Sequence, residues 1–92
     1  KLNEIKYIEG MREYVRIHLT NEKPIMTLLS MKAVEQQLPS NSFMRVHRSY
    51  IVNLKMITTI ERNRIVFDKV YIPVSEQHKE GFHQFVEKNF LS

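Results

Sequence analysis

The stretch Phe43-Met-Arg-Val-His-Arg-Ser-Tyr-Ile-Val-Asn53 is the most informative part of this chain of 92 residues. Arg45, His47 and Arg48 place three cationic or hydrogen-bonding side chains within four positions. Residues 50–52 follow directly and predict a β-strand, because aromatic and β-branched side chains favour extended structure. The stretch therefore predicts a polar, basic turn mounted on a rigid strand.

Basic charge is concentrated around this stretch. Residues 43–64 carry one acid, Glu61, against five basic side chains, namely Arg45, Arg48, Lys55, Arg62 and Arg64. Their excess of +4 equals the net charge of the whole chain, so the remaining residues are balanced. A net charge of +4 alone would equally suit a basic solvated surface, but a basic block on a scaffold is typical of proteins that bind polyanions.

Length and composition indicate one small domain over residues 1–92, with 42% hydrophobic residues to form a modest core. No apolar run approaches the roughly 20 residues that cross a bilayer. The absence of cysteine excludes disulfides and thiolate metal sites, which fits a reducing cytoplasm. Because the chain starts at Lys1 without a Met or a secretory signal, we expect a fragment of a longer cytoplasmic protein.

Hydrophobic periodicity predicts mostly strands. The expected strands cover residues 4–9, 14–19, 25–29, 43–46, 50–54, 56–61, 64–67 and 70–72. Two helices are expected, over residues 31–38 with Ser30 as N-cap and over residues 76–89 with Ser75 as N-cap. The second helix carries one apolar stripe, expected in the core, of Phe82, Phe85, Val86 and Phe90. Without alternation of strand and helix, we predict a β-rich α+β fold of small antiparallel sheets with two short helices.

Enzymatic chemistry is not indicated. His47 and Ser49 lack a third orienting group, and the carboxylates are scattered rather than paired. Glu80 and His83 have the spacing of half a di-iron site, but the chain offers no second copy. Two glycines cannot make a phosphate-binding loop, so we expect no enzyme activity, metal or cofactor.

The sequence matches a known family pattern in order along nearly its whole length. The matching residues are Tyr7-Ile8-Glu9, Tyr14-Val15-Arg16-Ile17, Leu38-Pro39, the 43–53 stretch and Ile72-Pro73-Val74-Ser75. Together they resemble a LytTR-type DNA-binding domain. The resemblance implies the C-terminal output domain of a LytR/AlgR-type bacterial response regulator in a two-component system. It also implies binding to double-stranded promoter DNA in pairs on imperfect direct repeats. We expect the isolated domain to be a monomer.

By the same resemblance, DNA contacts come from three loops rather than from an inserted helix. They are Arg12-Glu13-Tyr14, the His47-Arg48-Ser49 turn and the segment after Ser75. Many members carry a cation just after that serine, whereas this chain has Glu76, which leaves the contact to Gln77 or Lys79. The candidate DNA-binding residues are Arg12, Tyr14, Arg45, His47, Arg48, Ser49, Lys55, Gln77, His78 and Lys79.

Some assignments stay open at this level. Arg45 suits a structural role at a strand end as well as a phosphate contact. Tyr50 is expected in the core, and Asn53 in a turn or at a sheet end. Lys55 is expected to contact phosphate. The chain could instead be a protein-interaction or anionic-surface module, or bind RNA by stacking bases on Tyr14 and Tyr71.

Overall fold

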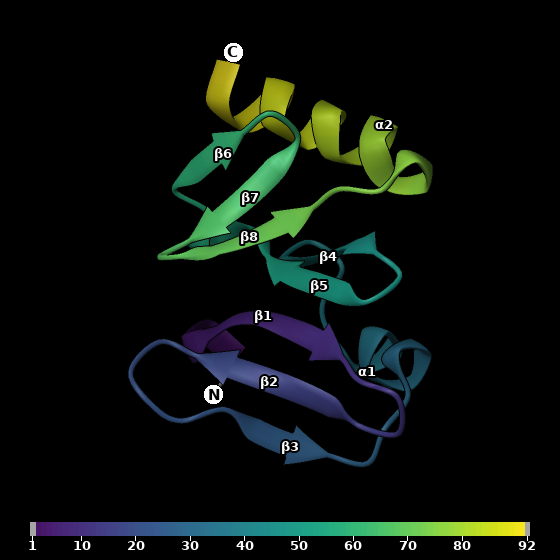
Figure 1. Ribbon diagram of the computed structural model, residues 1–92. Helices are drawn as coiled ribbons and strands as arrows, with labels where there is room; N and C mark the ends of the chain where they lie inside the picture. The colour runs from purple at the N-terminus through teal and green to yellow at the C-terminus, as the bar shows by residue number, and fades with distance from the viewer. Residues whose placement is uncertain (1, 92) are drawn as a thin grey trace.

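The structure, a computed structural model, describes the backbone of residues 2–91 and the side chains of residues 2–90. Two antiparallel sheets and two helices build it (Figure 1). The five-stranded sheet has the order β3 (Ile25–Thr27), β2 (Val15–Leu19), β1 (Ile5–Gly10), β5 (Tyr50–Asn53) and β4 (Phe43–His47). The three-stranded sheet contains β6 (Thr59–Glu61), β7 (Arg64–Phe67) and β8 (Val70–Pro73). The helices are α1 (Met31–Gln37) and α2 (Glu76–Val86), so the expected fold class is confirmed.

The inner strands β1 and β5 are covered on both faces of the five-stranded sheet, which gives the domain two hydrophobic clusters. On one face Ile8 and Ile51 pack with Val34 of α1. On the other face Tyr7 and Val52 pack with Phe82 of α2 and with residues of the smaller sheet. Successive strand residues point to opposite faces, which is why the neighbours Ile51 and Val52 belong to different clusters. Side chains of β1 and β5 therefore pack into both clusters.

Several boundaries differ from the sequence prediction. The third strand ends at Thr27. The strand expected over residues 56–61 begins at Thr59, because Leu54–Met56 form a 3₁₀ turn (η2). The Asn53 side chain caps that turn by accepting from the Lys55 backbone N–H at 3.1 Å. Its amide also donates to the Ile5 carbonyl at 2.8 Å, which confirms the sheet-end role expected for Asn53.

The C-terminal helix is also shorter than predicted. After Val86 the chain continues as a π-helical turn, Glu87–Leu91 (η3). A separate 3₁₀ turn, Leu2–Glu4 (η1), precedes β1. Phe82 is buried and Phe85 is half-buried, but Phe90 on the π-helical turn remains 49% exposed. The predicted core stripe is therefore correct for α2 and wrong at Phe90. In the described part of the chain no helix has the length and apolar character needed to span a membrane.

Candidate functional site

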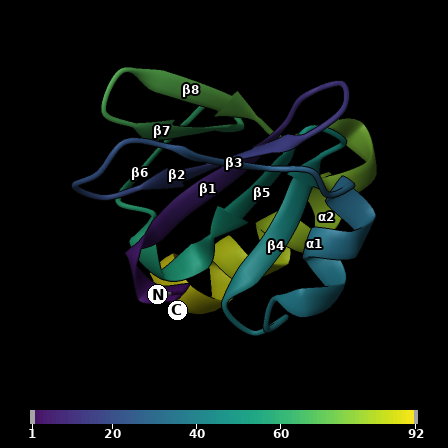
Figure 2. The ribbon, with the colours of Figure 1, turned by 90° about the horizontal axis from the view of Figure 1, so that it is seen from below.

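Three loops that are distant in sequence meet at one end of the five-stranded sheet. The Gly10 N–H donates to the Ser49 carbonyl at 2.7 Å, joining the β1–β2 loop to the β4–β5 turn. The Ser75 N–H donates to the Val46 carbonyl at 2.9 Å, joining the start of α2 to the same turn. All three lie on the right in Figures 1 and 2. We call this surface, residues 11–14, 47–49 and 75–79, the loop corner.

The strand order explains this convergence. β1 pairs antiparallel with both β2 and β5, and Glu9 lies opposite both Arg16 and Tyr50. The end of β1 and the starts of β2 and β5 therefore share one edge of the sheet. Between β4 and β5 the register shifts at Val46, a β-bulge that turns its carbonyl toward Ser75.

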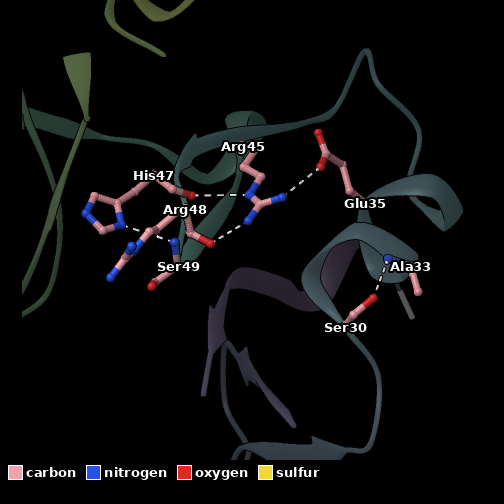
Figure 3. Close-up of polar contacts among 7 residues, drawn as sticks. All are labelled: Ser30, Ala33, Glu35, Arg45, His47, Arg48 and Ser49. Atoms are coloured by element: carbon pink, nitrogen blue, oxygen red, sulfur yellow. Dashed lines mark hydrogen bonds and ion pairs between the residues drawn. The ribbon is translucent and has the colours of Figure 1, made fainter. Parts of the chain in front are cut away.

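The β4–β5 turn is held by Arg45 (Figure 3). Its Nη2 donates to the Arg48 carbonyl at 2.5 Å, and its Nε lies 3.4 Å from the His47 carbonyl oxygen. Its Nη1 lies 3.3 Å from Oε1 of Glu35 on α1. The sequence left Arg45 open to a structural role or to a phosphate contact, and these contacts give it a structural role.

His47 also serves the turn. Its Nδ1 accepts from the Ser49 backbone N–H at 3.1 Å, so in a neutral ring the proton is on Nε2. The ring packs against Tyr50, with centroids 5.7 Å apart and planes at 60°. Tyr50 itself is half-buried against the core, and burial, followed by the nearby Glu9 charge, raises the pKa of its hydroxyl. His47 thus presents Nε2–H as its remaining donor.

Arg48 is the exposed member of the turn. Among the described residues no acceptor is bonded to its guanidinium, although its backbone carbonyl is held by Arg45. Figure 3 shows the Arg48 side chain leaving the turn on the side away from the Arg45 guanidinium. A cation whose backbone is fixed and whose head group is unpaired can bind an anion or a base edge at little ordering cost.

The start of α2 differs from expectation in its capping. Ser75 has the extended backbone of an N-cap, but its side chain makes no capping bond; its Oγ lies 2.7 Å from Nδ1 of His78 instead. Glu76 accepts from Lys79 at 2.9 Å, so the acid partly neutralises the cation beside it. Gln77 is exposed next to this pair. This part of the loop corner is polar rather than strongly basic.

The β1–β2 loop completes the loop corner. Met11 donates to the Tyr14 carbonyl at 2.8 Å, which closes the loop and leaves Arg12 exposed and Tyr14 half-exposed. A pocket of about 320 Å³ lies beside the loop, lined by Met11, Arg12, Glu13, Tyr14, Val15, Leu28, Leu29, Ser30 and Met31. Its lining is mixed, with apolar side chains from the β3–α1 connection.

Lys55 is the candidate residue that the structure does not bring to the loop corner. It lies on η2, beyond the far end of β5, where Asn53 pairs with Phe43 rather than with the turn. There Lys55 lines a separate pocket of about 350 Å³ with Leu2, Asn3, Pro39, Ser42, Phe43, Asn53 and Met56. Arg62 lies in the β6–β7 turn and Arg64 in β7, so both belong to the hairpin of the other sheet. The basic side chains of residues 43–64 are thus close in sequence but separated in space, because β5 leads the chain from the turn to the opposite end of the sheet.

One contributor to the site was missed from sequence. Glu35 lies on α1 and holds Arg45 from outside the basic stretch. No spacing rule connects residues 35 and 45, so the contact depends on how α1 packs. Among the described side chains, no three His, Asp or Glu residues gather in a way that could hold a metal ion.

Comparisons with known proteins agree with this architecture. The family model described as LytTr DNA-binding domain matches residues 1–87. A sensory transduction protein, LytT of Oceanobacillus iheyensis, is 34% identical over 58 residues, which cover 63% of this chain and 24% of LytT. A solved LytTr DNA-binding domain, from a Bacillus cereus protein described as a methyl-accepting/DNA response regulator, superposes with a TM-score of 0.78. It is 26% identical, and the match covers 91% of this chain and 82% of that one.

Proposed function

This chain belongs to the LytTR family of DNA-binding domains, and from that premise we propose that it reads promoter DNA through the loop corner. The family is a DNA-binding family and not an enzyme family, and a response-regulator domain shares the fold. The observation that carries the finer proposal is the convergence of three loops around the Arg48 guanidinium, which has no bonded partner among the described residues. No helix is needed in the groove.

Roles within the loop corner follow from chemistry. Arg48 reads a base edge, because Arg bonded to guanine O6 and N7 is the commonest specific contact in the major groove. His47 Nε2–H and the Ser49 hydroxyl donate to phosphate or to a neighbouring base. Arg12 and Tyr14 on one side, and Gln77, His78 and Lys79 on the other, contact the backbone of the flanking turns.

Lys55 is left out of this proposal. The sequence expectation of a phosphate contact placed it with Arg48, but the two lie beyond opposite ends of β5. Lys55 instead provides a control position with the same charge.

The proposal extends to the protein that carries the domain. The matched stretch spans 24% of LytT, whose name describes sensory transduction. We propose that the domain is the output part of a two-component regulator and that it binds in pairs on direct repeats. A pair of sites separated by about one helical turn, 10–10.5 base pairs, would put two domains on one face of the duplex.

A fluorescence-anisotropy titration tests the core of the proposal. The domain is titrated into a labelled duplex from upstream of its own gene and into a scrambled duplex. Arg48→Ala is expected to weaken the free energy of binding to the specific duplex by about 1–3 kcal/mol and to relax the base preference. Lys55→Ala, which removes the same charge at the far end of β5, is expected to leave both affinities nearly unchanged. Equal losses in the two variants would reject the loop corner as the reading surface.

A second candidate function is favoured by one observation. Exposed apolar side chains occur on β3 and in the segment after it, namely Ile25, Met26, Leu28 and Leu29. Such a group of side chains is typical of a protein-interaction surface. Firm binding to a protein partner, together with DNA binding that ignores sequence, would support this alternative.

A further inference from the structure

We propose that Arg45 is a positioning residue that sets the geometry of the DNA-reading turn and does not itself contact the duplex. The proposal rests on the function proposed above. Its basis is that the Arg45 guanidinium spans the His47 and Arg48 carbonyls, the two peptide groups that flank the Arg48 Cα. Fixing both carbonyls fixes the point from which the Arg48 side chain starts.

Arg45 holds the turn next to an irregular part of the β4–β5 pairing. The register shift between Arg45 and His47 interrupts the β4–β5 ladder just before the turn. The carbonyls of His47 and Arg48 point toward Arg45, and the Val46 carbonyl is taken by Ser75. A guanidinium is the side chain suited to this task, since it offers five donors in one rigid plane. A lysine ammonium cannot reproduce that planar fork.

Glu35 connects the brace to α1. Its Oε1 lies 3.3 Å from Arg45 Nη1, opposite the nitrogens that hold the turn. The Arg45 side chain is 24% exposed and that of Glu35 is 48% exposed, so solvent screens their attraction. Glu35 therefore orients the Arg45 guanidinium, while the hydrogen bonds from that guanidinium to the His47 and Arg48 carbonyls fix the turn.

A direct phosphate contact by Arg45 makes opposite predictions. Each neutralised phosphate contributes about 0.9 to the slope of log affinity against log salt on duplex DNA. A phosphate-binding Arg45 would be rescued by lysine, would act on all sequences alike and would add to the effect of Arg48. A positioning Arg45 acts through Arg48 and on the specific sequence alone.

The experiment measures binding of wild type, Arg45→Gln, Arg45→Lys, Arg48→Ala and the Arg45→Gln/Arg48→Ala double variant, on specific and scrambled duplexes over a range of salt. We expect Arg45→Gln to weaken specific binding about 10-fold, the size of one lost charge-assisted hydrogen bond, with the salt slope and scrambled-duplex affinity unchanged. Arg45→Lys should fail to restore binding. When Arg48 is already replaced by Ala, adding Arg45→Gln should weaken binding to the specific duplex only slightly further. Rescue by lysine, a slope reduced by about one, or additive losses would overturn the proposal.

A measurement without DNA separates this proposal from the proposed function. Amide hydrogen exchange at Ser49, whose N–H is held by His47 within the turn, should accelerate in Arg45→Gln and less so in Glu35→Gln. Unchanged exchange at Ser49 would refute the brace even if the domain binds DNA specifically. Accelerated exchange in a domain without sequence-specific binding would uphold the brace and refute the DNA-reading role. If Arg45→Gln does not fold, Arg45→Lys and Glu35→Gln carry the same test.

Discussion

The Gly10 backbone N–H and the Ser49 carbonyl, 39 positions apart in sequence, are joined at 2.7 Å. This bond puts the β1–β2 loop against the β4–β5 turn, and it lies under α1. A Cβ built on Gly10 would lie 2.8 Å from Cγ and 3.1 Å from Sδ of Met31. The absence of a side chain at position 10 thus makes room for Met31 of α1, whereas Ser49 Cα, at 3.7 Å from such a Cβ, would be in ordinary contact.

Gly10→Ala is expected to destabilise the domain by about 1–3 kcal/mol, since the added methyl overlaps Met31. Met31→Ala removes the overlapping atoms, so the double variant should lose less than the sum of the two single losses. Urea unfolding of the four proteins measures this coupling. Additive losses would show that Met31 does not set the requirement for glycine.

Asn53→Ala is expected to cost about 1–3 kcal/mol of unfolding free energy. The Asn53 side chain is buried and holds the Ile5 carbonyl and the Lys55 N–H, so truncation leaves a buried acceptor without its partner. Asn41→Ala, at an exposed loop position, is the matched control and should change stability by less than about 0.5 kcal/mol. The measurement is chemical denaturation of both variants; equal small losses would contradict the bridging role.

Stability is expected to fall as pH rises above about 10, the ordinary tyrosine value. Burial first, and the Glu9 charge second, raise the pKa of Tyr7 and of Tyr50 in the folded domain. The unfolded chain therefore releases these protons first, and deprotonation favours unfolding. Urea unfolding at pH 8 to 11 measures the decline. Tyr7→Phe should reduce its slope, whereas Tyr71→Phe, at an exposed ring, should not.

Glu76→Gln is expected to raise DNA affinity by roughly 2–5-fold on all sequences, because a carboxylate leaves the loop corner and Lys79 is released from its ion pair. The variant should also lose about 0.3–1 kcal/mol of stability, because Glu76 suits the first turn of α2. Glu22→Gln makes the same charge change in the exposed β2–β3 connection, away from the loop corner. An equal gain in both variants would mean that net charge alone is responsible.

Local patterns in the sequence predict most of the fold. Alternation in residues 14–19 and the Arg62-Asn63 turn led to correct elements, because each depends on neighbouring residues alone. In that turn both residues have positive φ, 49° and 65°, as a two-residue hairpin loop of type I′ requires. The strand expected to begin at residue 56 was wrong because the Asn53 side chain captures the Lys55 N–H and starts a 3₁₀ turn.

The candidate site is predictable in part. The three loops were expected from the family resemblance, and the structure brings them together through bonds between residues far apart in sequence. Lys55 lies apart from the loop corner, because β5 separates it from the turn that precedes β5 in sequence. The partnership of Arg45 with Glu35 depends on tertiary packing of α1, which no local pattern encodes.

The outer edge of β3 has a practical consequence for solution work. Backbone N–H and C=O groups along an edge strand can template pairing with a further chain, and the exposed Ile25 and Met26 side chains would add apolar contact. The ladder is short, three residues, and Pro24 just before it offers no N–H. Self-association through this edge should therefore be weak and should grow with concentration, so binding titrations are best kept dilute.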